Sequence, residues 1–532
     1  MMKQRVMLII LLGFGWLVPV QAQQTENLEI IWCRHGHRGH QTTIGRALQE
    51  CGDINADGYD DFLVMDASHS DTIVNRVYVF HGGNPPDTLP DLTIFGTKFS
   101  DWFGTSLASG LLNTDAYPDL VVGAAGIRQV NIYFGGPGMD TLTDLVLLPM
   151  GGYAFGDAVT TSDVNGDGWD DIVVGDYWFP DGAGKVSIYY GGPLLNSQVD
   201  IQLRGRWPET FGHAVGGGGD LNGDGYQDIA VGAPQNNDLY PNGGKVYVFF
   251  GGNPMDTIPD LWHYGENPGA WLGWRNRVAV TRISLNDDRY ADGWWGTPED
   301  PNPWQGTGYV LFGGNPMDPD PDLMWHGKTD TSDLCYSVAE GGRVTGGQYS
   351  SIIAGAVSEV GPGGFSGGAA YLYLGGAAMD TIPDGVIYGR GGYDAMGAVV
   401  AGAGDVNNDG RDEIMVSNYF CRMPPGVWVC RYTGVEVEEK KGDARLSMLD
   451  AGLRILQNPT RKAQGVRLLV IGDRPEAELK VYDVAGKLVQ SFTPCPSLIA
   501  SGPITLHLNP GVYFVRLETE AAMVTKKVVV VE

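Results

Sequence analysis

Four nine-residue segments of the chain repeat one pattern of oxygen-bearing side chains. The pattern is Asp-x-Asn-x-Asp-Gly-x-x-Asp/Glu, and it occupies residues 53–61, 163–171, 220–228 and 405–413. Side-chain oxygens stand at positions 1, 3, 5 and 9, and the residue at position 7 would add a backbone carbonyl. Because Ca²⁺ prefers roughly six to eight oxygen ligands, the pattern predicts calcium sites.

About four calcium ions with a structural role are therefore expected. The pattern contains neither thiolate nor imidazole groups, which argues against zinc or copper. The predicted ligands are Asp53, Asn55, Asp57, Tyr59, Asp61, Asp163, Asn165, Asp167, Trp169, Asp171, Asp220, Asn222, Asp224, Tyr226, Asp228, Asp405, Asn407, Asp409, Arg411 and Glu413.

An EF-hand loop opens in the same way, but it needs a Glu at position 12 and a helix on each side. Position 12 is instead occupied by Val64, Val174, Val231 and Val416. The β-branched runs after the loops end at small residues, which is typical of buried strands. The loops are thus predicted to join strands. A simple turn role for these Asp- and Asn-rich loops is disfavoured by their in-register repetition.

Weaker copies of the loop extend the repeat. Residues 111–119 and 284–292 keep positions 3, 5 and 9, whereas residues 343–351 have lost every carboxylate. The third positions, 55, 113, 165, 222, 286, 345 and 407, define seven units that lie 52 to 64 residues apart. The weaker candidate ligands are Asn113, Asp115, Asp119, Asn286, Asp288 and Asp292.

Each unit also holds a Phe-Gly-like segment before the loop, a third strand ending at a Gly-Gly turn, and a short fourth strand. Four short antiparallel strands repeated in this way predict an all-β fold, a seven-bladed β-propeller over residues 27–434. The seventh unit lacks a fourth strand. Residues 28–32 resemble the fourth strands of other units, so we expect them to complete blade seven and close the ring.

The Phe-Gly segment, the acidic loop and the Val-Val-Gly that follows it resemble the FG-GAP repeats of the integrin α-subunit propeller. The resemblance covers roughly residues 28–434. It implies a calcium-binding propeller related to cell adhesion. Ligands are missing from units two, five and six, so full sites are carried over only to units one, three, four and seven.

The two ends of the chain carry export signals. Residues 1–22 read as a secretory signal peptide, because Lys3 and Arg5 precede a short apolar run. Residues 435–449 form a charged linker, and residues 450–532 are predicted to be a small β-sandwich. Motifs in this last segment resemble the C-terminal sorting domain of type IX secretion substrates. That resemblance implies contact with the secretion machinery and a secreted or cell-surface protein exported past the outer membrane; an ordinary accessory β-sandwich is the alternative.

A formal charge of −28 disfavours binding to nucleic acid or to anionic membrane surfaces. Disulfides persist along the export route. Cys421 with Cys430, and Cys33 with Cys51, are two possible pairs among the six cysteines, and the sequence leaves the pairing open.

Residues 34–40 contain Arg-His-Gly, which is similar to the histidine phosphatase motif. A transition-metal site formed by His35, His37 and His40 is a second possibility, and a solvated polar loop is favoured over both. The chain shows no Gly-x-Ser-x-Gly elbow and no phosphate-binding loop. The protein is therefore predicted not to be an enzyme.

The face of the propeller opposite the calcium loops should carry long, aromatic connections. Trp178, Tyr240, Trp304 and Phe365 are candidate ligand-face residues, unless each ring only caps its own blade. The sequence thus predicts a calcium-binding propeller that acts as a binding or adhesion module for an extracellular protein or glycan. The alternatives are a secreted hydrolase or lyase that uses the propeller face, and a structural surface-layer component.

Overall fold

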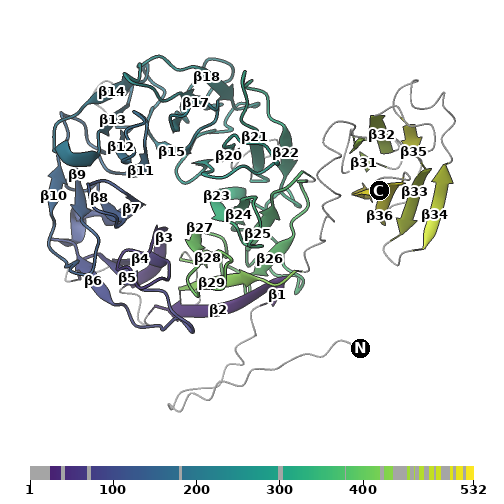
Figure 1. Ribbon diagram of the computed structural model, residues 1–532, viewed down its shortest axis with the longest axis horizontal. Helices are drawn as coiled ribbons and strands as arrows, with labels where there is room; N and C mark the ends of the chain where they lie inside the picture. The colour runs from purple at the N-terminus through teal and green to yellow at the C-terminus, as the bar shows by residue number, and fades with distance from the viewer. Residues whose placement is uncertain are drawn as a thin grey trace, which may run out of the picture. The chain divides into compact units, whose positions relative to one another are not determined.

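The computed structural model describes residues 24–36, 42–68, 73–178, 182–297, 304–377, 379–419 and 425–434, together with Lys487 and the strands between 452 and 531. The chain forms two compact units, which are described separately. In the first unit, seven antiparallel sheets stand around an axis as the blades of a propeller (Figure 1). The predicted all-β, seven-bladed fold is confirmed. Among the described residues, no helix is long and apolar enough to cross a membrane.

In each blade the strands follow one another outwards from the axis (Figure 1). Blades one to four consist of β3 (Thr42–Gly52), β4 (Asp61–Ser68), β5 (Arg76–Phe80) and β6 (Leu92–Phe95); β7 (Phe103–Gly110), β8 (Asp119–Ala124), β9 (Gln129–Tyr133) and β10 (Leu145–Leu147); β11 (Ala158–Ser162), β12 (Asp171–Asp176), β13 (Lys185–Tyr189) and β14 (Ile201–Arg204); and β15 (Ala214–Gly219), β16 (Asp228–Gly232), β17 (Lys245–Phe249) and β18 (Leu261–Tyr264).

The last two of these seven blades each take one strand from the start of the chain, as a fifth strand in blade six and as the fourth strand in blade seven. Blades five to seven consist of β19 (Val278–Val280), β20 (Gly293–Thr297), β21 (Thr307–Leu311) and β22 (Leu323–His326); β23 (Leu334–Gly342), β24 (Ser351–Ala356), β25 (Ala369–Leu374), β26 (Gly385–Tyr388) and β1 (Gln24–Glu26); and β27 (Val399–Gly404), β28 (Glu413–Ser417), β29 (Gly426–Tyr432) and β2 (Leu28–His35). Two short 3₁₀ helices, η1 (Phe99–Asp101) and η2 (Gly192–Leu194), lie in connections.

Ring closure follows the prediction. β2 pairs antiparallel with β29 and forms the fourth strand of blade seven, so the two ends of the propeller lie side by side (Figure 1). The ring of Trp32 on β2 also packs on blade one, with centroid distances of 5.2 Å to Phe62 and 5.0 Å to Phe80. The sequence did not reveal β1, which pairs with β26 of blade six. The first strands therefore bridge two blades.

The continuous valine-rich runs after the loops are explained by burial on both sides. All six residues of β12 are buried, because a neighbouring blade covers each face of the sheet. The core consequently lies between blades. Val173 on β12, for example, packs in one cluster with Phe211 and Val231 of blade four.

The two glycines of the repeat motif meet where neighbouring blades come closest. A Cβ on Gly175, which ends the valine run of blade three, would lie 2.2 Å from the carbonyl oxygen of Gly212 in blade four. Gly212 has a φ of +85°, a conformation that glycine adopts easily. The Phe-Gly and Val-Val-Gly motifs thus form the two sides of one blade-to-blade contact.

The second unit contains two sheets, with strand orders β30-β32-β35 and β31-β37-β36-β33-β34. Their strands are β30 (Gly452–Ile455), β31 (Thr460–Arg461), β32 (Val466–Ile471), β33 (Glu478–Asp483), β34 (Leu488–Phe492), β35 (Ile504–Leu506), β36 (Gly511–Glu518) and β37 (Met523–Val531). The sandwich packing of these sheets and the domain boundaries stay predictions. The predicted signal peptide and the predicted linker lie outside the described residues.

The cysteines depart from the suggested pairs. Cys33, Cys51, Cys335 and Cys430 are free thiols, so the pairing of Cys33 with Cys51 is wrong. Cys33 lies on an outer strand of blade seven, whereas Cys51 is buried on the innermost strand of blade one. Cys421 lies outside the described residues.

The histidine segment begins on a strand of the propeller. His35 ends β2, and its ring packs edge-on against Trp428 with a centroid distance of 5.6 Å. His37 and His40 lie outside the described residues, so the histidine metal site stays a prediction.

Candidate functional site

The acidic loops join the first and second strands of their blades. Because successive strands of a blade are antiparallel, the turns between third and fourth strands lie on the same face of the propeller as these loops. We call this the loop face. The connections between second and third strands, and those between blades, lie on the opposite face, which we call the ligand face.

The side chains at positions 1, 3 and 5 fold each full loop around its own amide groups. In unit three, Asp163 accepts hydrogen bonds from the backbone N–H groups of Asp167 (3.1 Å) and Gly168 (2.9 Å). Asn165 Oδ1 accepts a bond from the N–H of Asp167 at 2.9 Å, and Asp167 Oδ1 accepts one from Trp169 at 3.0 Å. The bonds to position 1 recur at Asp53, Asp220 and Asp405.

Position 9 ties the loop to the rest of the blade. Asp171 is fully buried; its Oδ2 accepts a hydrogen bond from the N–H of Val164 at 3.0 Å, and its Oδ1 accepts one from Gly191 at 2.9 Å. The same pair of bonds is made by Asp61, Asp119, Asp228 and Asp292. Position 9 therefore joins the start of the loop to the Gly-Gly turn, whether or not the other ligand positions are complete.

The weaker loops keep positions 3 and 5 because these side chains accept hydrogen bonds from the backbone of their own loop, as they do in the full loops. In unit two, Asn113 Oδ1 accepts a bond from the N–H of Asp115 at 2.7 Å, and Asp115 Oδ1 accepts one from Tyr117 at 2.9 Å. Asn286 and Asp288 repeat these bonds in unit five. These side chains shape a turn by themselves, so their presence alone does not indicate a bound ion.

The carboxylates of the full loops are crowded. Burial raises the pKa of the Asp171 carboxyl to about 8, and the carboxylates of Asp167 and Asp163 add to this rise. Burial likewise raises the pKa of Asp228 and of Glu413 to about 8. A cation in the loop would favour the ionised forms of these carboxyl groups. It would thereby remove the destabilisation that burial and neighbouring carboxylates cause.

The donor chemistry of the full loops fits a hard cation, although the side-chain arrangement is not that of a formed metal site. Across the described ranges, no group of three or more His, Cys, Asp or Glu side chains is placed to hold a metal ion. The carboxylates are turned to backbone N–H groups instead, as at Asp163 and Asp171. Each carboxylate oxygen has a second lone pair available for a ligand bond. The twenty calcium ligands stay a prediction.

Position 8, which sequence reasoning missed, joins neighbouring loops. Asp60 Oδ2 accepts a hydrogen bond from the N–H of Asp405 at 2.8 Å, and the N–H of Asp60 donates to the carbonyl of Asp405. Similar links connect Asp170 with Leu111, Gln227 with Asp163, and Asp412 with Arg343. The recurrence of Asp or Gln at position 8 was the available signal. These residues hold the loops of successive blades together, including the closing pair of blades seven and one.

Replacing Asp60 by alanine is expected to lower the free energy of unfolding by about 1 kcal/mol, since the N–H of Asp405 loses its acceptor. Asp60→Asn should restore most of the loss, because the amide oxygen of Gln227 fills the same role elsewhere. Denaturant unfolding measures the free energy of unfolding of the mature protein and of both variants. Asp330→Ala, at an exposed residue, removes the same charge and should have little effect; an equal loss there would contradict the assignment.

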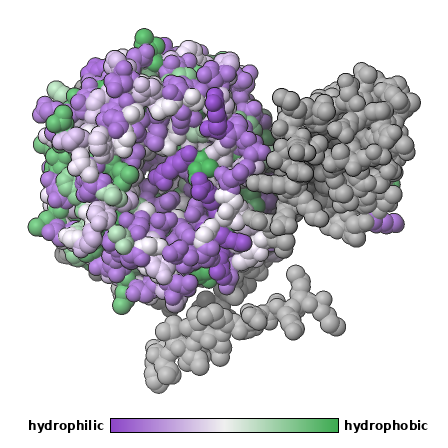
Figure 2. Space-filling model, viewed as in Figure 1, coloured by the Kyte–Doolittle hydropathy of each residue, from purple (hydrophilic) through white to green (hydrophobic). Residues whose placement is uncertain are grey.

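The four predicted ligand-face residues are all substantially exposed. The exposed fractions are 62% for Trp178, 37% for Tyr240, 55% for Trp304 and 55% for Phe365. Connections between blades on the same face expose further aromatic residues, namely Trp102, Tyr153, Trp207 and Tyr393. The surface seen in Figure 2 is mainly hydrophilic, with hydrophobic residues scattered over it and along its edge. The aromatic rings on the ligand face are exposed and are therefore available for contact with a partner.

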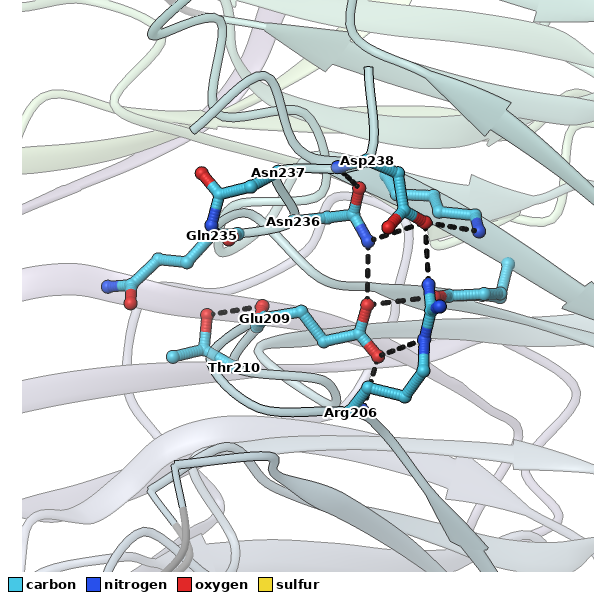
Figure 3. A network of polar contacts seen from close by, with 9 residues as sticks. Arg206, Glu209, Thr210, Gln235, Asn236, Asn237 and Asp238 are labelled. Atoms are coloured by element: carbon cyan, nitrogen blue, oxygen red, sulfur yellow. Dashed lines mark hydrogen bonds and ion pairs between the residues drawn. The ribbon is translucent and has the colours of Figure 1, made fainter. Parts of the chain in front are cut away.

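A polar network holds the connection that carries Tyr240 (Figure 3). The carboxamide of Asn236 donates to Glu209 Oε2 at 2.7 Å, and the guanidinium of Arg206 donates to Asp238 Oδ2 at 2.6 Å. Glu209 is 3% exposed and belongs to the connection between blades three and four. The network thus fixes two neighbouring connections to each other, and Tyr240 is presented on a well-supported loop.

Two family models match the chain. The FG-GAP repeat matches residues 155–189 and 211–249, in blades three and four. The secretion system C-terminal sorting domain matches residues 458–531. The chain is an integrin α-like FG-GAP propeller protein with a C-terminal sorting domain. The sorting domain directs type IX export to the cell surface or beyond and contacts the secretion machinery.

Curated relatives of this FG-GAP protein include integrin α subunits. Integrin alpha-PS2 of Drosophila melanogaster is 31% identical over 215 residues, which are 36% of this chain and 15% of that protein. Integrin alpha-6 of Homo sapiens is 42% identical over 140 residues, or 25% of this chain and 12% of its own. The chain spans between 9% and 17% of the length of seven integrin α subunits that it matches.

A solved structure provides a more distant likeness. It is PorZ, described as an essential bacterial surface component of the type-IX secretion system of Porphyromonas gingivalis. The alignment covers 92% of this chain and 59% of PorZ, with 10% sequence identity and a TM-score of 0.37.

Proposed function

We propose that this exported propeller is a non-enzymatic binding module that recognises an extracellular protein or glycan through its ligand face. The observation that carries the proposal is the set of exposed aromatic residues on connections held by hydrogen bonds. Tyr240 lies on the connection that Asn236 ties to Glu209, and the carbonyl of Trp178 accepts a hydrogen bond from the N–H of Tyr153 at 3.0 Å. Aromatic side chains with little conformational freedom favour binding surfaces. The export signal places this face where extracellular ligands are available.

Calcium has a structural role in this proposal. The full loops would hold Ca²⁺ through positions 1, 3, 5, 7 and 9. Burial and mutual repulsion disfavour ionisation of the loop carboxyl groups, and the bound ion would neutralise their negative charge. The ions would stiffen the loop face, and through the blades they would support the connections on the ligand face.

Trp178→Ala and Tyr240→Ala are expected to weaken ligand binding about tenfold or more, because central aromatic residues dominate the binding energy of an interface. A glycan array and a pull-down with the mature propeller in calcium identify the ligand, and calorimetry then compares the variants. Leu142→Ala is the matched control, since Leu142 is 72% exposed in a turn on the loop face.

Two results would contradict the proposal. Ligand binding that is lost in Leu142→Ala but kept in both ligand-face variants would place the binding site on the loop face instead of the ligand face. Turnover of polysaccharides, lipids or phosphoesters that disappears when ligand-face residues are replaced would show that the protein is an enzyme.

A further inference from the structure

Side chains from several blades converge at the axis on the ligand face. Tyr177 and Tyr419 follow β12 and β28, and Tyr336 lies near the start of β23. Arg275 and Arg277 directly precede β19, and Arg46 lies on β3. We call these six residues the arginine mouth. They come from blades one, three, five, six and seven, and residues so far apart around the ring come together only at the axis.

The contacts made by the arginine mouth join residues of different blades. Arg275 Nε donates to Asp157 Oδ2 of blade three at 2.8 Å. The guanidinium of Arg277 lies 5.1 Å from the ring centroid of Tyr336, and its Nε donates to the Tyr336 carbonyl at 3.1 Å. The hydroxyl groups of Tyr336 and Tyr419 are hydrogen-bonded to each other. The mouth is therefore a built cluster, with its side chains held in place.

Positive charge exceeds negative charge in this cluster. Arg275 is paired with Asp157, whereas Arg46 has no carboxylate partner among the described residues, and its charge is close enough to act on the Tyr419 hydroxyl. The next acidic group, Asp333, accepts a hydrogen bond from Ser358 at 2.9 Å. Arg46 is half-buried, and the side chain of Arg275 is 35% exposed, so the cluster is partly open to solvent.

The other end of the axis has the opposite charge. On the loop face, Arg282 lies 3.8 Å from Glu50, and the backbone N–H of Arg282 donates to Glu340 at 3.0 Å. Asp170 and Asp412 also lie close enough to Arg282 to act on its charge. Four carboxylates thus act on the charge of Arg282 there. An anion that approaches this chain, which has a formal charge of −28, is attracted to the arginine mouth and repelled from the opposite end.

Aromatic faces lie beside the arginine mouth. The His213 ring is sandwiched between Tyr177 and Trp274, with centroid distances of 4.2 and 4.6 Å and interplanar angles of 33° and 34°. Tyr177 and Trp274 are both partly exposed. The end of the axis therefore combines guanidinium groups with flat apolar surfaces.

We propose that the arginine mouth binds the carboxylate of an acidic sugar, as found in uronate-containing polysaccharides. A uronate residue uses both kinds of group, because its carboxylate pairs with guanidinium while the C–H face of its ring packs on aromatic side chains. An acidic peptide side chain would use only the guanidinium groups. This inference rests on the proposed function, in that it assigns one ligand class to the ligand face.

Calorimetry with the full mature protein and three probes tests the inference: an oligogalacturonate, a neutral galactose oligomer of the same length, and a polyglutamate peptide. The oligogalacturonate should bind most tightly, and Arg46→Gln should weaken it about tenfold through loss of a charge-assisted hydrogen bond. Arg343→Gln on the loop face removes the same charge from a unit without calcium ligands and should leave binding unchanged. Melting curves check folding; if Arg46→Gln does not fold, Arg46→Lys should still show a smaller loss.

Three outcomes would overturn the inference. If the neutral oligomer binds as tightly as the oligogalacturonate and Arg46→Gln has no effect, the ligand face binds glycans but contains no uronate site. Preferential binding of polyglutamate would assign the mouth to an acidic peptide. Absence of binding to all three probes would overturn the inference while leaving the proposed function intact, provided that ligand-face variants still disrupt capture of another ligand.

Discussion

Calcium removal is expected to lower the stability of the mature protein more than any single loop substitution does. Each ion present at one hundred times its dissociation constant adds about 2.7 kcal/mol to the free energy of unfolding. Four complete loops are available for such binding. Without cations, burial and neighbouring carboxylates work against ionisation of residues such as Asp171 and Asp228. Differential scanning calorimetry in calcium and in EDTA measures the difference.

Two substitutions separate calcium binding from loop shape. Asp224→Ala removes position 5 of a complete loop, so it should reduce the difference between the calcium and EDTA melting temperatures. Asp115→Ala removes the same position from unit two, where Leu111 stands at position 1. This second variant should leave the calcium-dependent difference unchanged. Identical melting curves of the unsubstituted protein in calcium and in EDTA would contradict the structural role of the ion.

Asp119→Ala is expected to destabilise the protein strongly and to the same extent with and without calcium. Asp119 is fully buried, and its carboxylate accepts hydrogen bonds from the N–H groups of Leu112 at 3.1 Å and Gly135 at 2.9 Å. An unsatisfied buried donor costs about 1–3 kcal/mol, so losing the acceptor of both donors should cost about 2–6 kcal/mol. Urea unfolding in calcium and in EDTA provides the measurement.

The control for this prediction lies in the same loop. Asp115 is exposed and serves only the local turn, so Asp115→Ala should cost far less than Asp119→Ala. Asp119→Asn keeps one oxygen acceptor and should recover part of the loss. Similar unfolding free energies for Asp119→Ala and Asp115→Ala would show that the hydrogen bonds of position 9 do not stabilise the blade.

The sequence by itself determined the architecture of this protein. The repeat fixes seven units, the valine at position 12 places strands after the loops, and the missing strand of unit seven predicts the pairing of β2 with β29. These features are readable because each is local or periodic: a loop and the strand beside it carry their own pattern of side chains. The exposed Trp178 and Tyr240 were found in the same way, from connections that break the repeat.

Only the tertiary structure decided which distant residues meet. The link between Asp60 and Asp405 depends on ring closure, and so does the pairing of β1 with blade six. The buried hydrogen bonds of Asp171 show why position 9 persists in loops that lack other ligands. The convergence of Arg46 with Arg275 has no sequence signal, because residues of different blades meet at the axis only when the ring has closed.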